Sequence, residues 1–501
     1  MSQELKELKT RLAELSDLNA IQALLGWDQS SIMPAGAGEG RGRQMSLMSR
    51  MLHEKFTDPA IGRLLESLRK QAEQWPADSI DAQLVAVTAK DYEQSTRVPA
   101  AFVSEMTEHS NASYMAWAEA RPANDFTKVV PYLEKTLELS RKYASFFPGF
   151  AHIADPLIDQ SDAGMTVATI RPLFKTLRDG LVPMVDAICR QAPADDSCLQ
   201  GPFPIAMQME YGRTLAEVVG YDFHRGRLDT ALHPFEARLA YGDIRITTRA
   251  RENDLGDCIF SVIHECGHAM YEQGVAFELE GTPLAHGTSS GVHESQSRLW
   301  ENLVGRSRTF WQHQYPGLQA IFPAQLGHVS LDTFYRAINK VSRSLIRTDA
   351  DEVTYNLHVI IRFELELELL EGTLAVKDLA RAWKERYATV LGIEPPNDKD
   401  GVLQDVHWYA GGIGGSFQGY TIGNVMSAQI YDAALASNPA IATDIAMGNY
   451  RSLLAWLQTN LYATGRRWDA PGTLKRVTGQ DLTVAPYFAY LKSKYGELYS
   501  L

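Results

Sequence analysis

The sequence predicts a mostly α-helical protein, a large multi-helix fold with one small β-hairpin. Apolar residues recur at intervals of three and four through most of the 501 positions, which is the spacing of an amphipathic α-helix. Only residues 236–250 alternate apolar and polar residues, as a half-buried strand does. The composition, 45% apolar and 22% charged, is that of a globular chain with a substantial core.

The helical pattern begins near the N-terminus, where leucines at positions 5, 8, 12, 15 and 18 lie on one face. The same spacing predicts helices at about residues 82–121, 127–147, 165–192, 204–219, 257–274, 291–303, 331–345, 350–371, 376–391, 422–437, 450–464 and 483–498. No repeat, low-complexity tract or flexible linker divides the chain. We therefore expect a single domain over residues 1–501, with lobes around a cleft.

Residues 236–250 predict a short hairpin directly before the helix at 257–274. Tyr241, Ile244 and Ile246 alternate with polar residues, and Gly242 provides a turn. A strand at the edge of a groove can bind an extended peptide through main-chain hydrogen bonds.

Charge and cysteine content exclude several classes of protein. The formal net charge of −13 argues against binding to nucleic acid or to an anionic membrane surface, which needs a basic face. The N-terminus has no signal-like apolar stretch, and no segment approaches the roughly 20 apolar residues that span a bilayer. Four cysteines without CxxC spacing indicate reduced thiols. We expect a cytoplasmic protein.

The helix at 257–274 carries the motif His264-Glu-Cys-Gly-His268. Residues four apart share one face of a helix, so the two histidines can bind one metal ion. Glu265 is rotated by about 100° and can act as general base toward water that the metal activates. Cys266 lies on the opposite side and is expected to pack. Gly267 indicates that another element crosses the helix closely, since glycine costs roughly 1 kcal/mol there.

A catalytic zinc site needs a third protein ligand. Glu294 is the expected ligand, on a helix that Ser289 or Ser290 caps. His293 is an alternative, although its side chain points about 100° away from that of Glu294. We expect the helix at 257–274 to begin at an Asp257 cap and to end at Gly274.

Together with other motifs, these residues resemble the carboxypeptidase Taq family of metallocarboxypeptidases. The motifs match in order over about residues 233–424. They are His233-Pro-Phe235 (HPF), Asp243-Ile-Arg245-Ile-Thr247 (DxRxT), His264-Glu-Cys-Gly-His268, His293-Glu294-Ser-Gln296, Ile346-Arg347-Thr-Asp-Ala350-Asp351 (IRxxAD) and Gly401-Val-Leu-Gln404-Asp405-Val-His407-Trp408 (GxxQDxHW).

The resemblance implies a deep active-site groove and removal of single C-terminal residues from peptides that have a free C-terminus. It also implies one divalent metal per chain, with zinc expected and cobalt as an alternative, and a homodimer. Residues 1–230 would line the groove, with the hairpin at its edge, and residues 231–430 would carry the metal and substrate motifs.

The glycine-rich segment 409–424 predicts a loop close to a ligand or to another part of the backbone. Family members often have Tyr-Phe-Pro-x-Tyr here, whereas this chain has Ser416-Phe-Gln-Gly-Tyr420. The difference affects the expected geometry of the loop and the expected preference for substrate side chains. It leaves the metal motifs unchanged.

The remaining motif residues have chemically distinct expected roles. His407 and Tyr420 can donate hydrogen bonds to the oxyanion that forms during peptide hydrolysis. Arg347 is the first candidate, and Arg245 the second, to bind the substrate carboxylate, because a guanidinium binds carboxylates through two hydrogen bonds.

Three further motif residues, His233, Gln404 and Asp405, are expected to line the groove or support residues that contact substrate. Two alternatives to a carboxypeptidase remain. One is an endopeptidase or dipeptidase with the same metal chemistry. The other is a peptide-binding protein that has lost catalysis, which would not need Glu265 as a base.

Overall fold

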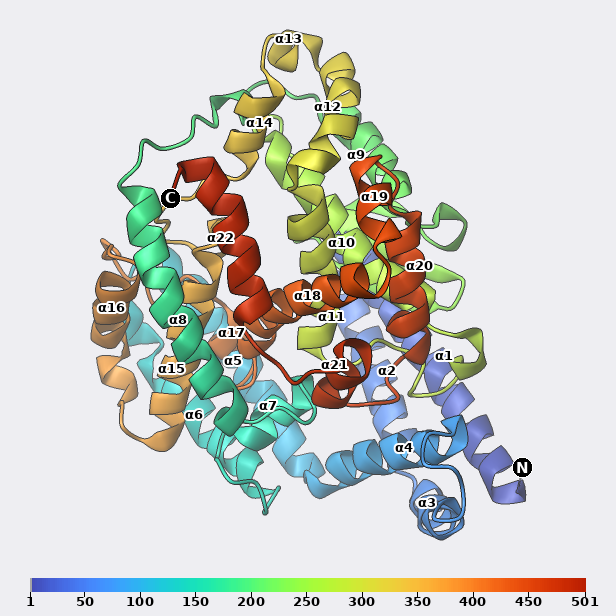
Figure 1. The fold of residues 1–501 in the computed structure, drawn as a ribbon. Helices are drawn as coiled ribbons and strands as arrows, with labels where there is room; N and C mark the ends of the chain where they lie inside the picture. The colour runs from blue at the N-terminus through green and yellow to red at the C-terminus, as the bar shows by residue number, and fades with distance from the viewer. Residues whose placement is uncertain (1) are drawn as a thin grey trace.

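Helices make up nearly all of the regular structure in the computed structural model, which describes residues 2–501 (Figure 1). The α-helices are α1 (Gln3–Ser31), α2 (Gly38–Phe56), α3 (Pro59–Ala72), α4 (Ile80–Arg97), α5 (Ala100–Ala123), α6 (Val130–Ser145), α7 (Asp155–Ser161), α8 (Val167–Cys189), α9 (Ile205–Val219), α10 (Leu255–Gly274), α11 (Ser290–Arg298), α12 (Arg308–Ile321), α13 (Pro323–Leu326), α14 (Leu331–Ile338), α15 (Tyr355–Glu371), α16 (Leu379–Val390), α17 (His407–Ala410), α18 (Gln418–Ser437), α19 (Ala440–Ala446), α20 (Arg451–Asn460), α21 (Ala470–Thr478) and α22 (Ala485–Tyr499). A π-helix, Leu299–Gly305, continues directly from α11. The predicted mostly helical fold class is confirmed.

Two predicted helices and one predicted loop have different bounds. The stretch 82–121 forms two helices, α4 and α5, because Pro99 cannot continue a helix and Val98 before it is extended. The helix predicted at 331–345 ends at Ile338, where the Asn339 amide donates to the carbonyl of Tyr335. The glycine-rich segment is a loop only in part, because α18 already begins at Gln418.

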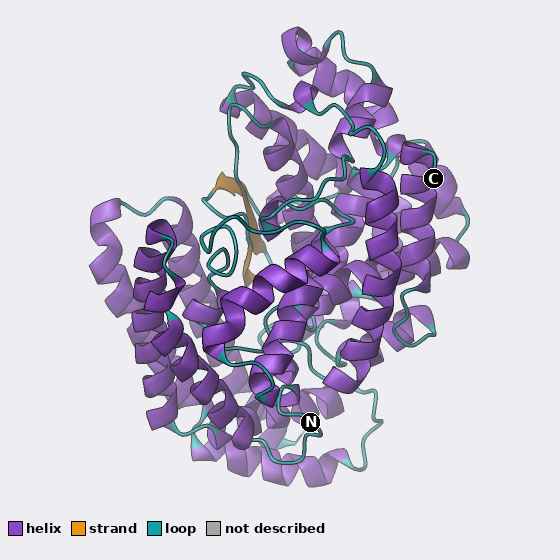
Figure 2. Cartoon of the chain, turned by 90° about the vertical axis from the view of Figure 1, so that its left-hand side faces the viewer, coloured by secondary structure: helices purple, strands orange, loops and turns teal. Residues whose placement is uncertain are grey.

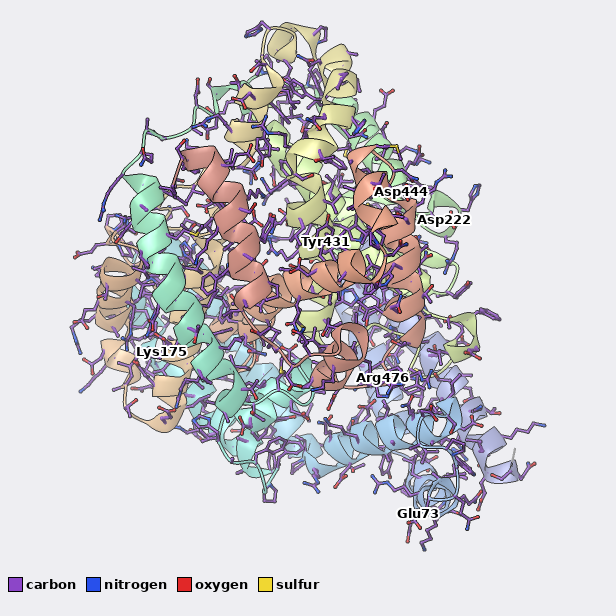
Figure 3. The ribbon with its side chains drawn as sticks, viewed as in Figure 1. Glu73, Lys175, Asp222, Tyr431, Asp444 and Arg476 are labelled. Atoms are coloured by element: carbon purple, nitrogen blue, oxygen red, sulfur yellow. The ribbon has the colours of Figure 1, made fainter. Side chains whose placement is uncertain are left out.

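Helix α2 was not predicted because its sequence lacks the periodic signal. None of its residues is buried, so no apolar stripe marks a face. Helix α8, which was predicted, does have a buried apolar face. Phe174 lies on that face, whereas its neighbour Lys175 projects from the outer face (Figure 3).

The predicted hairpin is present, within a sheet of three strands (Figure 2). Strands β2 (Glu236–Ala240) and β3 (Asp243–Thr248) are antiparallel, and β1 (Leu228–Thr230) pairs in parallel with β3. Ile244 and Ile246 of β3 are fully buried. Because side chains alternate across a strand, Arg245 between them projects from the other face of the sheet, where its guanidinium lies over the Trp27 ring of α1.

Two clusters of buried apolar residues form the core. The smaller one joins the predicted leucine stripe of α1 to α3, α4 and residues 275–285. The larger one extends from residue 120 to residue 499 and includes α10 and α18. Helix α18 runs across the middle of the molecule, packed along α11 (Figure 1). Among residues 2–501, none of the helices combines the length and apolar character that crossing a bilayer requires.

Helix α10 packs closely against the segment from α11 to the π-helix. The Asp254 carboxylate caps α10, in place of the expected Asp257, by accepting from the Asp257 N–H. Cys266 is fully buried and packs in the core as expected. A Cβ atom on Gly267 would lie 2.5 Å from the Cα of Ser297. The inference that another element crosses closely at Gly267 is therefore confirmed.

We expect Gly267→Ala to lower the free energy of unfolding by about 1–3 kcal/mol, the range for overpacking a core contact. The added methyl group meets the backbone of Ser297, which cannot rotate away as a side chain can. Urea unfolding followed by tryptophan fluorescence measures the change.

Gly256→Ala in the same helix is the matched control. A Cβ there has no neighbour closer than 3.5 Å, so alanine should be neutral or stabilising by up to about 1 kcal/mol. Equal unfolding free energies for Gly267→Ala and the unchanged protein would show that the two segments separate without cost.

Candidate metal centre

Helices α10 and α11 bring three potential metal ligands together. The Nε2 atoms of His264 and His268 lie 3.7 and 3.4 Å from the same oxygen, Oε2 of Glu294. One ligand atom from each residue falls within 4.8 Å of the other two. Two imidazole nitrogens and a carboxylate oxygen suit a divalent metal such as zinc, with a coordination position left for water or substrate.

The N-terminus of α11 is fixed before Glu294 is reached. Ser289 caps the helix by accepting from the Val292 N–H, 3.1 Å away. Asp162 accepts from the Gly291 N–H at 2.6 Å. On the other side, a Cβ on Gly423 of α18 would lie 2.6 Å from Cγ of Glu294. Helix α18 therefore packs directly on the carboxylate side chain and limits its movement.

Charged side chains hold two of the three ligands in place. His264 Nδ1 lies 2.9 Å from Oε2 of Glu301 in the π-helix. Arg298 donates from Nε to Oε1 of Glu294 at 2.7 Å and from Nη1 to Oε2 of Glu301 at 3.2 Å. Such outer partners fix ring orientation and would keep the ligand atoms directed at a bound metal.

His293, the alternative third ligand, has both ring nitrogens occupied by other partners. Its Nδ1 lies 2.6 Å from Nδ1 of His268, and its Nε2 lies 3.0 Å from Oε1 of Glu272. The adjacent residues His293 and Glu294 therefore face different groups, as the rotation between neighbouring helix positions requires.

Burial shifts the protonation of the centre. Burial raises the pKa of Glu265 to about 7, with the nearby charge of His264 acting in the opposite direction. Burial also lowers the pKa of His268 to about 4. For Glu294, burial alone would raise the pKa, but the charges of Arg298 and His264 hold it well below its usual value. A neutral His268 and an ionised Glu294 are the forms that bind metal.

Four of the other predicted site residues form a second cluster around Arg347. The guanidinium donates from Nη2 to Oδ1 of Asp405 at 2.9 Å, and its backbone N–H donates to Oε1 of Gln404 at 3.0 Å. His407 Nδ1 lies 3.8 Å from the same oxygen of Asp405, and His407 Nε2 lies 3.4 Å from the Tyr420 hydroxyl.

Tyr355 connects this cluster to the metal ligands. Its hydroxyl accepts from Nη1 of Arg347 at 3.0 Å. Its ring lies under the guanidinium of Arg298, 4.7 Å from the ring centroid. Tyr420 belongs to α18, one turn before the glycine that packs on Glu294. The two clusters are thus linked through Tyr355.

Two predicted site residues lie apart from these clusters. Arg245 forms a two-point ion pair with Asp243, at 2.8 and 2.7 Å, on the sheet face that carries Trp27 contacts. His233 is exposed in the connection between β1 and β2. Neither contacts the metal ligands or Arg347 within the described part of the chain.

Three residues of the site were missed by sequence reasoning, although helical spacing could have indicated them. Arg298 and Glu301 follow Glu294 by four and seven positions, so they share its helix face. Glu272 follows His268 by four positions and continues the stripe of the two histidines.

Comparisons with known proteins show the family to which the chain belongs. A family model described as carboxypeptidase Taq (M32) metallopeptidase matches residues 7–495. Thermostable carboxypeptidase 1 of Thermus thermophilus is 40% identical over an alignment of 507 positions, which covers 99% of this chain and 98% of that protein. Carboxypeptidase 1 of Bacillus subtilis is 35% identical over 497 residues, 99% of each chain.

Solved structures share the entire fold. The M32 carboxypeptidase from Deinococcus radiodurans R1 has 51% sequence identity and a TM-score of 0.97, over 100% of both chains. Trypanosoma cruzi metallocarboxypeptidase 1 has 29% identity and a TM-score of 0.93, over 98% of this chain and 99% of that one. The resemblance seen in the ordered motifs is confirmed, and the chain belongs to the carboxypeptidase Taq (M32) family of metallopeptidases.

Proposed function

We propose that this metallocarboxypeptidase removes the C-terminal residue of peptides at a centre in which His264, His268 and Glu294 bind one divalent metal. The convergence of their three ligand atoms within 4.8 Å carries the proposal. Zinc is the expected metal, because histidine nitrogens and one carboxylate are its usual catalytic ligands, and cobalt is the alternative.

Glu265 acts as the general base in this proposal. A divalent ion held by His264, His268 and Glu294 would lower the pKa of a bound water to about 7 and polarise the peptide carbonyl. Glu265 accepts the proton of the attacking water and passes it to the departing amine. Burial raises the pKa of Glu265 above its usual range, which is the direction needed by a group that takes a proton and then returns it near neutral pH.

His407 and Tyr420 donate hydrogen bonds to the developing oxyanion. Burial, together with the Arg347 charge, lowers the pKa of His407 to about 4, so its ring is neutral at pH 7. Burial raises the pKa of Tyr420 to about 12, so its hydroxyl keeps its proton. Both groups can therefore donate without a change of charge.

Arg347 binds the C-terminal carboxylate of the substrate. Asp405 faces two buried guanidinium groups, those of Arg347 and Arg362. Two positive charges against one negative charge leave one positive charge unbalanced. A substrate carboxylate would supply the missing negative charge and accept a charge-assisted hydrogen bond. Gln404 and Asp405 orient Arg347. Arg245 is the second candidate for the carboxylate, and His233 belongs to the wider groove.

The proposal also includes the organisation of the whole chain. Residues 1–501 form one catalytic domain, with residues 1–230 lining a deep groove and residues 231–430 carrying the metal and substrate motifs. We propose a cytoplasmic homodimer that acts on peptides. Light scattering after size-exclusion chromatography tests the dimer, since a mass of 55.8 kDa would indicate a monomer.

Removal of the metal should abolish activity. Metal-depleted protein should release no amino acid from an N-terminally blocked dipeptide, and added zinc or cobalt should restore release of the free C-terminal residue. Amino-acid analysis of the products measures the release. The matched peptide with a C-terminal amide should resist, because it lacks the carboxylate that Arg347 binds.

Two outcomes would contradict this function. Equal cleavage of the amidated peptide would indicate an endopeptidase. No release from this or longer peptides with any metal would indicate a peptide-binding protein.

Glu265→Gln should lower kcat/KM by roughly 10²–10⁴-fold, the usual contribution of general acid–base catalysis, with unchanged metal content. Peptide hydrolysis and elemental analysis measure the two quantities. Tyr420→Phe, which removes only a hydroxyl, should lower kcat by less.

Glu366→Gln is the matched control for this series. Burial also raises the pKa of Glu366 to about 7, but its carboxylate accepts from the Trp408 indole N–H at 2.8 Å. The kcat/KM of the Glu366→Gln protein should stay within a few-fold of that of the unchanged protein. A fully active Glu265→Gln protein would rule out the proposed base.

Arg347→Ala should lower kcat/KM by roughly 10–100-fold, because a hydrogen bond to a charged group contributes about 1.5–3 kcal/mol. The same change at Arg245, which lies over Trp27 and apart from the metal ligands, should have a smaller effect. Steady-state kinetics on the blocked dipeptide compares the two variants. An undiminished kcat/KM for Arg347→Ala would remove Arg347 from the carboxylate site.

A further inference from the structure

The two histidines of the centre are supported in different ways. His264 Nδ1 meets a carboxylate directly, Oε2 of Glu301 at 2.9 Å. His268 Nδ1 meets another imidazole, Nδ1 of His293 at 2.6 Å, and the two rings are tilted by 30° with centroids 4.7 Å apart. The other ring nitrogen of His293, Nε2, then lies 3.0 Å from a carboxylate oxygen, Oε1 of Glu272.

This arrangement restricts where the protons can lie once His268 binds a metal. A hydrogen bond between two imidazole nitrogens needs one proton, carried by one ring, and a lone pair on the other. If Nε2 of His268 binds metal, its single proton must be on Nδ1. His293 then accepts at Nδ1 and carries its own proton on Nε2, from which it donates to Glu272. The opposite arrangement would put the His268 proton on Nε2, where it faces Glu294 and blocks the metal.

Glu272 is well placed to select this tautomer of His293. The carboxylate is almost fully buried, and its Oε1 also accepts from the Gly287 N–H at 2.7 Å. Nε of Arg238 lies 3.3 Å from Oε2. An ionised carboxylate has no proton to give, so the hydrogen bond to His293 requires the proton to be on Nε2 of that histidine.

We propose that Glu272 and His293 are positioning residues that fix the tautomer and ring orientation of His268 and so set the affinity for the metal. The inference rests on the proposed function only in that His268 is a ligand. We call the series His268–His293–Glu272 the relay. Helix α10 supplies both of its ends, because His268 and Glu272 are one turn apart, and α11 supplies His293 in the middle.

The test measures metal affinity without substrate. Zinc dissociation constants are obtained by competition with a chromophoric chelator, and cobalt(II) absorption spectra report the ligand geometry at saturation. His293→Leu removes both hydrogen bonds and should raise the zinc Kd by roughly 10–100-fold, the usual cost of losing an outer-shell partner. The cobalt spectrum should change as well.

Two conservative variants separate the links of the relay. In His293→Asn, the side-chain oxygen can replace Nδ1 as acceptor, so part of the affinity should return. Glu272→Gln keeps an acceptor oxygen but loses its charge, and charge-assisted hydrogen bonds are roughly twice as strong as neutral ones. Its zinc Kd should rise several-fold.

His286→Leu is the matched control. His286 Nδ1 lies 3.9 Å from Oε2 of Glu272, and its side chain is 52% exposed. It faces the same carboxylate but does not contact His268, so the zinc Kd should stay within about two-fold, well below the outer-shell effect.

Each result supports or overturns the relay. A folded His293→Leu protein with the original zinc Kd and cobalt spectrum overturns it, as does an equal loss of affinity in His286→Leu. If His293→Leu does not fold, an unchanged Kd in Glu272→Gln overturns it. His264→Ala separates this from the proposed function: if it also binds zinc normally, the proposed metal centre itself is wrong.

Discussion

The close packing of α10 against α11 and the π-helix that follows is the constraint on which the site depends. At Gly267 the two segments approach so closely that no side chain fits between them. This contact sets the separation between the two histidines on α10 and the carboxylate of Glu294 on α11. Helix α18 then packs on Glu294 from the other side. The geometry of the three candidate ligands therefore follows from the close approach of two backbone segments, which is stiffer than a side-chain arrangement.

A chain of compensated charges surrounds this contact. An isolated charge is costly to bury, whereas a paired and hydrogen-bonded charge is tolerated. Glu294 and Glu301 share Arg298, and Arg306 adds a second guanidinium to Glu301. Around Arg347 the compensation is incomplete, with two guanidinium groups for one carboxylate. That imbalance of charge would favour binding of a substrate carboxylate, which contributes the missing negative charge.

Helical spacing accounts for how much of the site could be predicted. His264 and His268 share a face because they are four residues apart in one helix, and this needs no tertiary information. The cap of α10 shows the limit of that reasoning, since Asp254 and Asp257 are equally plausible by residue type and only the backbone geometry favours Asp254. Helix α2 lay beyond prediction because it buries none of its side chains.

The sequence by itself determined the fold class, the position of the hairpin and the helix face that presents the two histidines, because these depend on local periodicity. Only the tertiary structure decided which residue approaches that face, since His293 and Glu294 are adjacent and both could bind a metal. It also placed Arg245 against Trp27 and Arg347 against Asp405. The motifs contain both arginines, but the partner of each depends on how distant segments pack. That packing cannot be inferred from local sequence spacing.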